Sequence, residues 1–209
     1  MQSKNDRNTY NLDTAYNIVR ERLANVDIAQ QCQKSGADSS SQMVTLNYLN
    51  QNYRITIPTA EVSFSDNDQS VPMREKILIL HYFTRAKGTP PTGRQITYRD
   101  LPGGLVYYPT FTRRTVKPLA DCFGKDAALL LRAGKLFNAH QGEFEDVSLI
   151  IDAFARVPIT IILWEGDDEL APQINLLFDA NITDFLEPED VTIVCETIIW
   201  QLIKYSKKK

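Results

Sequence analysis

Two apolar segments of eight residues each, separated by only two residues, constrain the fold of this chain most strongly. Residues 147–154 and 157–164 consist mainly of Val, Ile, Leu and Phe. Apolar runs of this length on either side of a tight corner are typical of neighbouring strands. We therefore predict a pair of antiparallel strands in the core of the protein.

The remaining periodicity predicts helices and further strands in no strict alternation. Helical spacing of apolar residues is found over 12–34, 73–87, 110–123, 126–137 and 187–205. Strand patterns are found over 43–49, 53–58, 60–64, 95–98 and 105–108, with a short apolar segment at 174–178. This mixture is typical of the α+β class. We predict a single α+β domain over residues 10–205, with antiparallel strands and hairpins packed against several helices and a long C-terminal helix. A disordered N-terminal tail (1–9) and a basic C-terminal tail (206–209) would flank it.

The composition is that of a globular protein in a reducing compartment. The chain has 209 residues, 43% of them hydrophobic, which is enough for a buried core. Its apolar runs are far shorter than the roughly 20 residues that span a bilayer, and its N-terminal residues are polar. Cys32, Cys122 and Cys195 are widely separated, which argues against a disulfide framework or a zinc site. We expect a cytoplasmic protein that does not contact a membrane.

Charge is distributed unevenly along the chain. The net charge of -3 argues against nucleic acid as a partner. Residues 74–135 hold twelve Lys and Arg against four Asp and Glu, whereas residues 143–190 hold thirteen Asp and Glu against one Arg. The two segments could pack together and compensate one another, or the basic segment could carry an anion site. The sequence leaves both interpretations open.

The basic segment is also rich in aromatic residues, which suggests a ligand-binding role. Guanidinium groups suit carboxylates and phosphates, and aromatic rings suit planar ligands. The glycines in this segment match neither a Walker loop nor a dinucleotide-binding fingerprint. Our candidate ligand-binding residues, including two from the acidic segment, are Arg94, Tyr98, Arg99, Asp100, Arg113, Arg114, Arg156 and Trp164.

Two features could hold a metal ion. The acidic residues Asp167, Asp168 and Glu169 follow a predicted strand, and oxygen ligands of this kind suit Mg²⁺ or Ca²⁺. Their spacing is not that of a calcium loop, and an exposed acidic turn is the alternative. His81 lies on the inward face of its predicted helix, where it is either a core histidine or an axial ligand to a metal or tetrapyrrole. The two histidines and scattered cysteines indicate no catalytic triad or dyad, so the balance is against an enzyme.

Several short motifs occur in an order that resembles a known family. They are His81-Tyr82-Phe83, Thr92-Gly93-Arg94, Tyr98-Arg99-Asp100-Leu101-Pro102-Gly103-Gly104, Trp164-Glu165-Gly166-Asp167-Asp168-Glu169 and Leu177-Phe178-Asp179. Over roughly residues 10–205 the chain resembles domain of unknown function 3786, a prokaryotic family found mostly in anaerobes. It departs from that pattern at Ala155, where the family is expected to have Pro, and at Glu169-Leu170-Ala171-Pro172, where Glu-Phe-Pro is expected.

The resemblance implies a biochemical context rather than an activity. Such domains sometimes accompany iron–sulfur domains and corrinoid-linked one-carbon chemistry. This chain has no four-cysteine segment, so no intrinsic iron–sulfur cluster is expected. The resemblance therefore implies a corrinoid or tetrapyrrole-type cofactor, or an iron–sulfur or corrinoid protein as the partner.

Three hypotheses for the function follow. The leading one is an accessory domain that binds an anionic or corrinoid-type ligand, or a redox-protein partner. The alternatives are a divalent-metal-dependent enzyme that uses the acidic loop 165–169, and a module that only docks to other proteins. If the loops around Arg99 and Trp164 face one cleft, then Arg99, Arg113, Arg156 and the acidic residues line it; otherwise they form a structural salt-bridge network.

Overall fold

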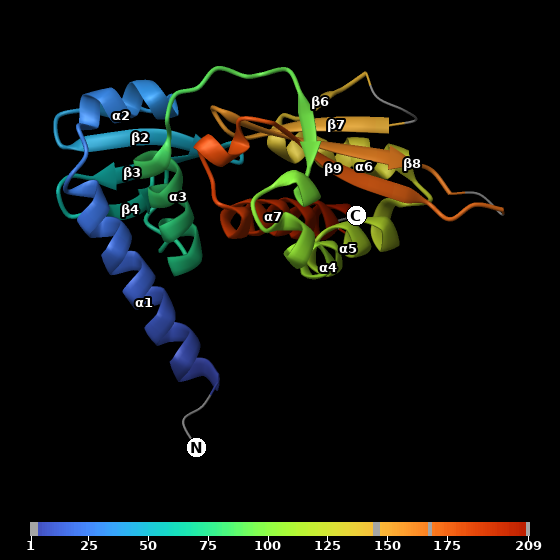
Figure 1. The fold of residues 1–209 in the computed structure, drawn as a ribbon, viewed down its shortest axis with the longest axis horizontal. Coiled ribbons are helices and arrows are strands. Elements are labelled where there is room, and N and C mark those ends of the chain that lie inside the picture. Colours follow the sequence, from blue (N-terminus) through green and yellow to red (C-terminus); the bar gives the residue numbers. More distant parts are fainter. Residues whose placement is uncertain (1–3, 144–146, 167–168, 208–209) are drawn as a thin grey trace.

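The computed structural model describes residues 4–143, 147–166 and 169–207 (Figure 1). Over these ranges the chain forms two antiparallel sheets with helices packed beside them, and the predicted α+β class is confirmed. None of the helices in these ranges combines the length and apolar character needed to cross a membrane.

The first half of the chain forms a four-stranded antiparallel sheet. The strands pair in sequence order: β1 (Asp38–Ser40), β2 (Met43–Tyr48), β3 (Gln51–Thr56) and β4 (Glu61–Phe64). Alternate residues of β2 and β3, such as Val44 and Ile55, are buried, which is the period-two pattern of a sheet with one face in the core. The helices beside this sheet are α1 (Lys4–Leu23), α2 (Ile28–Ser35) and α3 (Met73–Arg85) (Figure 1).

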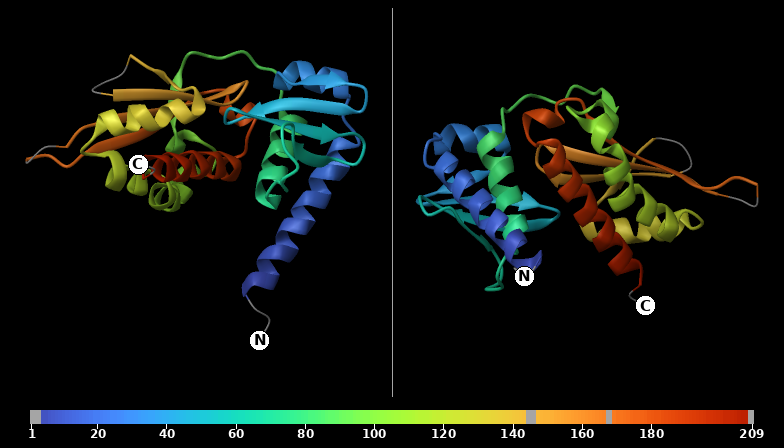
Figure 2. Two further views of the ribbon diagram at one scale, coloured as in Figure 1. Left: turned by 180° about the vertical axis from the view of Figure 1, so that it is seen from behind. Right: turned by 60° about the horizontal axis from the view of Figure 1, so that its bottom comes forward.

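The second half forms a five-stranded antiparallel sheet with helices on one side (Figure 2). Its strand order is β5-β9-β8-β7-β6. The strands are β5 (Gln95–Thr97), β6 (His140–Gln141), β7 (Val147–Phe154), β8 (Val157–Trp164) and β9 (Gln173–Asp179). The helices are α4 (Gly104–Arg114), α5 (Val116–Phe123), α6 (Ala127–Gly134) and α7 (Pro188–Ser206), and the 3-10 turns are η1 (Tyr98–Asp100), η2 (Lys135–Phe137) and η3 (Ile182–Asp184). The predicted hairpin is present as β7 and β8, with the predicted bounds.

The first predicted helix is two helices. Where periodicity suggested one helix over 12–34, α1 ends at Leu23 and α2 starts at Ile28. The Asp27 carboxylate accepts a hydrogen bond from the Gln30 N–H (3.0 Å), so Asp27 caps a new helix. Gly36, with φ of 72°, ends α2 as expected. Helix α1 begins at Lys4, within the segment for which we predicted a tail.

The predicted strand at 105–108 is wrong, because these residues form the start of α4. The aromatic and branched residues of this segment favour a strand, but the turn at Gly103 sends the chain into a helix instead. The predicted helix over 110–123 is also divided. At Thr115 the backbone leaves helical geometry (φ −126°, ψ −75°), and the Thr115 hydroxyl donates to the Phe111 carbonyl (2.7 Å).

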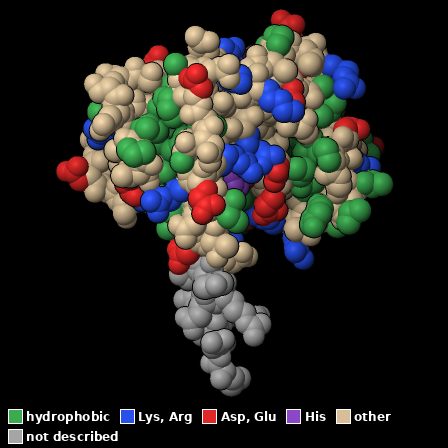
Figure 3. Space-filling model, turned by 60° about the vertical axis from the view of Figure 1, so that its left-hand side comes forward, with side chains coloured by type: hydrophobic (Ala, Val, Ile, Leu, Met, Phe, Trp, Pro, Cys, Tyr) green, Lys and Arg blue, Asp and Glu red, His purple; other side chains and the backbone are tan. Residues whose placement is uncertain are grey.

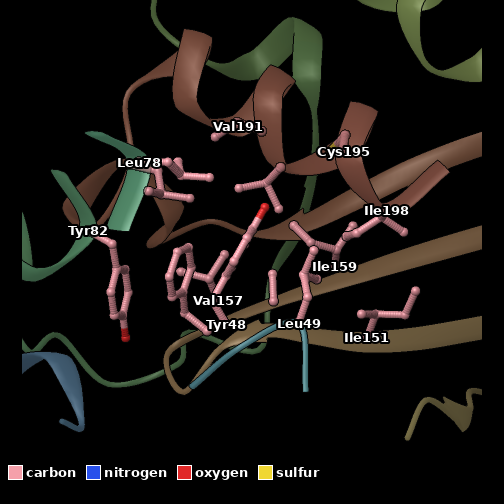
Figure 4. Packing of buried hydrophobic residues seen from close by; sticks show 14 of the residues in the cluster. Tyr48, Leu49, Leu78, Tyr82, Ile151, Val157, Ile159, Val191, Cys195 and Ile198 are labelled. Carbon is pink, nitrogen blue, oxygen red and sulfur yellow. The ribbon is translucent and has the colours of Figure 1, made fainter. Parts of the chain in front are cut away.

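A stack of three aromatic rings joins the two halves of the fold. Phe154, at the corner between β7 and β8, stacks on Tyr48 of β2 and on Tyr82 of α3. Figure 4 shows Tyr48 and Tyr82 among the buried residues around this contact. The ring centroids are 4.6 Å apart for Tyr48 and Phe154 and 4.0 Å apart for Tyr82 and Phe154. The Leu49 N–H also donates to the Ala153 carbonyl (2.9 Å). The hairpin of the second half is thus inserted into the core of the first half.

Truncation of Phe154 should therefore destabilise the whole domain. We expect Phe154→Ala to lower the free energy of unfolding by about 3–5 kcal/mol, because it removes buried apolar surface and leaves a cavity between two rings. Phe154→Leu, which retains more volume, should cost less. Urea denaturation followed by circular dichroism and tryptophan fluorescence measures both losses. A loss below about 1 kcal/mol for Phe154→Ala would contradict the conclusion that this ring joins the two halves of the fold.

Candidate functional site

The structure brings Arg99 and Trp164, which come from two separate motifs, to one surface hollow. The hollow has a volume of about 330 Å³ and is named here the Arg99 hollow. It is lined by Thr97, Arg99, Tyr108, Trp164, Gln173, Ile174 and Asn175. The elements that build it are η1, the start of α4, and the paired ends of β8 and β9.

The segment from Tyr98 to Gly104 holds Arg99 in place through its backbone. The Asp100 carboxylate accepts hydrogen bonds from the Thr97 N–H and hydroxyl (both 2.8 Å), and these bonds lower the pKa of Asp100. A Cβ at Gly104 would lie 1.9 Å from the Tyr98 carbonyl oxygen, so only glycine fits there. This close turn starts α4 and brings Tyr108 beside Arg99.

Arg99 lies with its guanidinium carbon 4.0 Å from the centroid of the Tyr108 ring. A guanidinium stacked on a ring in this way keeps the N–H groups at its edge free for hydrogen bonds. Arg99 is the one charged residue among those described around the hollow, and it forms no ion pair within the described ranges. The hollow therefore has a positive and aromatic wall.

Trp164 is the last residue of β8, and the residues after it are held against the helices. Trp164 pairs with Gln173, the first residue of β9, so the two side chains share one face of the sheet. The Glu165 carboxylate accepts a hydrogen bond from the Ala127 N–H at the start of α6 (2.7 Å). The Gly166 N–H donates to the Gly124 carbonyl (3.1 Å). Trp164 is therefore fixed at the edge of a rigid sheet.

The hollow lies at a free edge of the second sheet. Strand β5 pairs with only residues 177–179 of β9. The preceding residues of β9, which include Gln173 and Asn175, pair with β8 on one side and with no described strand on the other. Polar backbone and carboxamide groups of β9 are thus available beside Arg99.

Other arginines of the basic segment are used in the structure. Arg114 forms ion pairs with Glu196 (2.7 Å) and Glu189 (3.2 Å), and its hydrogen bond to Glu196 raises its pKa. Arg85 pairs with Glu187 at the start of α7. On the face shown in Figure 3, basic and acidic side chains lie next to one another. The basic and acidic segments thus compensate one another at these positions. Arg99, like Arg94 and Arg113, has no ion pair within the described ranges, but of these three it alone lines the hollow.

The remaining ligand candidates are dispersed. Tyr98 is buried, where it stacks on Phe111 (4.0 Å between centroids) and its hydroxyl contacts Thr192 on α7 (3.0 Å). Arg94 is exposed before β5, and Arg113 is exposed on α4. Arg156 is exposed at the corner of β7 and β8, close to Gly36 in the first half. None of these four residues lines the Arg99 hollow.

Of the four metal candidates, the structure describes Glu169 and His81. Asp167 and Asp168 lie outside the described residues, and Glu169 is exposed. His81 Nδ1 lies 2.9 Å from Asp190 Oδ1, and Asp190 also closes the capping box of α7. A carboxylate on one ring nitrogen is common for metal-bound histidines, but this contact also serves to join α3 to α7. Within the described ranges, no three His, Cys, Asp or Glu residues are grouped for a metal ion.

The sequence analysis did not identify the carboxamides of Gln173 and Asn175 or the role of Tyr108. The polar residues at alternate positions of β9 were the signal that could have indicated them, because such residues share one face of a strand.

The class of protein defined by these features is a single α+β domain with a hollow at a sheet edge that Arg99 and aromatic residues line. A family model described as Domain of unknown function (DUF3786) matches residues 27–200, and the chain belongs to this family. The matched segment contains every residue that lines the Arg99 hollow. No curated protein and no solved structure matches the chain.

The side chain of Asp179 links two of the motifs named above, Thr92-Gly93-Arg94 and Leu177-Phe178-Asp179. Its buried carboxylate accepts hydrogen bonds from the Thr92 N–H and hydroxyl, the Gly93 N–H (2.9 Å) and the Asn181 N–H (3.0 Å). Burial alone would raise the pKa of Asp179, but these hydrogen bonds outweigh it and lower the pKa. The chain that enters β5 is therefore anchored to the end of β9.

Asp179→Asn should lower the free energy of unfolding at neutral pH by about 1.5–3 kcal/mol, because several donors lose a charged acceptor. A carboxylate with a lowered pKa stabilises the fold above its ordinary value of 3.8, and this contribution is lost as the pH falls through the lower folded value. The difference between wild type and variant should therefore shrink below about pH 4. Denaturation across a pH series measures it, with the exposed Asp152→Asn as the control. A difference that stays constant on acidification would contradict this role.

Proposed function

We propose that this protein is an accessory binding domain, and that the Arg99 hollow holds an anionic ligand of small-molecule size. The observation that carries the proposal is the guanidinium of Arg99, stacked on Tyr108 above a hollow with no described carboxylate in its lining. A charged group at a preformed hollow, with no ion pair among the described residues, is suited to an external counter-charge.

The lining supports a ligand with an anionic group and a planar part. The edge of a guanidinium can form two parallel hydrogen bonds to a carboxylate or phosphate. The rings of Tyr108 and Trp164 can contact a planar group, and the carboxamides of Gln173 and Asn175 can form hydrogen bonds to its polar atoms. The volume of about 330 Å³ lies at the lower end of the range for small-molecule sites.

The same lining favours binding over catalysis. The described residues around the hollow include no histidine, cysteine, aspartate or glutamate. A general base or an activated nucleophile would normally come from these residue types. The proposal is therefore a binding role, without a reaction at this hollow.

The resemblance at the level of motifs suggests a more specific ligand. A corrinoid or haem combines a planar ring with polar or anionic groups at its edge, and one such edge could enter the hollow beside Arg99. His81, with Asp190 on one ring nitrogen, is the candidate axial ligand in this version of the proposal. A corrinoid or iron–sulfur protein could supply the anionic group instead.

An apolar surface next to the hollow supports a protein partner as the second candidate. Leu105, Val106 and Tyr107, on the first turn of α4, are 71%, 80% and 59% exposed. Adjacent exposed apolar side chains are typical of interaction surfaces. In this version, an acidic side chain of the partner would pair with Arg99 while its apolar residues cover α4.

Binding at Arg99 can be measured through Trp164. In a Trp200→Phe background, Trp164 is the one remaining tryptophan, and its fluorescence reports on the hollow. We expect saturable binding of phenyl phosphate, weaker binding of inorganic phosphate and none of phenol. Arg99→Gln should weaken phenyl phosphate binding at least tenfold, or about 1.4 kcal/mol, because the charge that pairs with phosphate is lost. Arg113→Gln, which changes an exposed arginine of α4 outside the hollow, is the matched control and should leave binding unchanged.

Equal effects of the two arginine variants, or no saturation by any anion, would contradict the proposal. Hydroxocobalamin and haemin are tested separately by visible spectroscopy, where a band shift that Arg99→Gln abolishes would identify a tetrapyrrole-type ligand. Val106→Glu tests the partner version. It should abolish a complex seen in pull-down experiments while phenyl phosphate still binds.

A further inference from the structure

Two further hollows, which share lining residues, lie between the two halves of the fold, away from the Arg99 hollow. One has a volume of about 410 Å³ and the other about 200 Å³. Tyr48 and Glu75 line both, with residues of β3 and α3 on one side and residues of α7 on the other. We call the two together the Glu75 groove.

The larger hollow is rich in oxygen atoms and carries a negative charge. Its polar lining consists of the Glu75 carboxylate, the Tyr48 and Tyr53 hydroxyls, and the carboxamides of Asn50, Gln51 and Gln201. Among the described residues that line it, none is a lysine or arginine. The smaller hollow contains Arg74 and Glu196, but Glu196 is paired with Arg114 (2.7 Å).

Glu75 is half-buried, and its described hydrogen-bond partner is neutral. The Tyr53 hydroxyl donates to Glu75 Oε1. Burial raises the pKa of Glu75, although the bond from Tyr53 acts in the opposite direction. Glu75 forms no ion pair within the described ranges, although Arg74 lines the smaller hollow with it; a cation bound in the larger hollow, which has no described Lys or Arg, would pair with Glu75 directly.

Tyr48 provides an independent indication of a ligand. Its side chain is only 2% exposed, and its hydroxyl has no hydrogen-bond partner among the described residues. Figure 4 shows the hydroxyl pointing toward α7. The Thr197 hydroxyl lies close enough to act against burial, which raises the pKa of Tyr48, but it donates to the Ile193 carbonyl (2.8 Å) and is not placed for a regular hydrogen bond with Tyr48. Buried hydroxyls in folded proteins are nearly always paired, so this one is suited to a bound molecule.

Aromatic rings complete the wall of the larger hollow. Tyr53 and Phe64 lie with their centroids 5.0 Å apart, and both line it. Aromatic faces and edges beside a carboxylate are well suited to an organic cation, because the ring quadrupole attracts positive charge and the ring carbons contact its alkyl part. A bare metal ion would gain less from such a wall.

We propose that the Glu75 groove binds a small primary ammonium compound, whose N–H groups pair with Glu75 and the Tyr48 hydroxyl and whose alkyl part lies against Phe64. A primary ammonium has three donors, which matches the acceptors gathered here. The proposal is independent of the Arg99 hollow, because no residue lines both.

The test compares n-butylamine with butan-1-ol, a neutral molecule of nearly the same shape. Near neutral pH, calorimetric titration and thermal denaturation of the full chain should show saturable binding and stabilisation by n-butylammonium and neither effect with butan-1-ol. Glu75→Gln should weaken n-butylammonium binding at least tenfold. Glu61→Gln, which removes an exposed acid of β4 outside the groove, is the matched control and should leave binding unchanged.

Tyr48→Phe distinguishes a binding role from a structural one. Removal of a hydroxyl without a partner should leave the stability of the ligand-free protein unchanged or increase it, while n-butylammonium binding falls severalfold. The proposal would be overturned if butan-1-ol bound equally well, or if n-butylammonium did not saturate. It would also be overturned if Glu75→Gln left n-butylammonium binding unchanged, or if Tyr48→Phe clearly lost stability without ligand.

Discussion

The ring of Phe154, held between Tyr48 and Tyr82, is the contact on which the rest of the structure depends. It belongs to the second sheet but is buried in the first half of the chain. Stacked aromatic rings bury a large area and tolerate little displacement. The stack therefore fixes the position of β2 and α3 relative to the β7–β8 corner, and Tyr48 of this stack also lines the Glu75 groove. Strand β8, which leaves this corner, carries Trp164 at its far end, so both hollows depend on one hairpin.

Ion pairs also orient the helices around this apolar contact. His81 with Asp190 and Arg85 with Glu187 connect α3 to the first turn of α7, and Arg114 connects α4 to the same helix. Exposed ion pairs contribute little stability, so their main effect is to select one arrangement of the helices. They also place part of the basic segment, Arg85 and Arg114, opposite acidic residues at the start of α7 and along it. Arg99 differs because its contact is an aromatic ring and not a carboxylate.

The sequence predicts those parts of the fold that local patterns determine. The β7–β8 hairpin and the last helix have strong periodicity and the predicted positions. The break at Asp27 and the helical start at Leu105 depend on a cap and on a turn packed against Tyr98, which periodicity does not report. For the site, motif residues indicated Arg99 and Trp164. Gln173 enters the hollow through strand register, and the alternate polar residues of β9 were its only sequence signal. Glu75 meets Tyr48 through packing of the two halves, which local sequence patterns do not report.

The motifs that contain Arg99 and Trp164 hold two kinds of residue: those that build the local backbone and those whose side chains line the hollow. Asp100 caps η1, and Gly104 allows the close turn against Tyr98. Glu165 holds the start of α6, and a Cβ at Gly166 would lie 2.5 Å from Pro172. These residues are required by the backbone they build. The side chains of Arg99 and Trp164 instead line the same hollow. In the function proposed above, the neighbouring residues of the two motifs position these two side chains for a ligand.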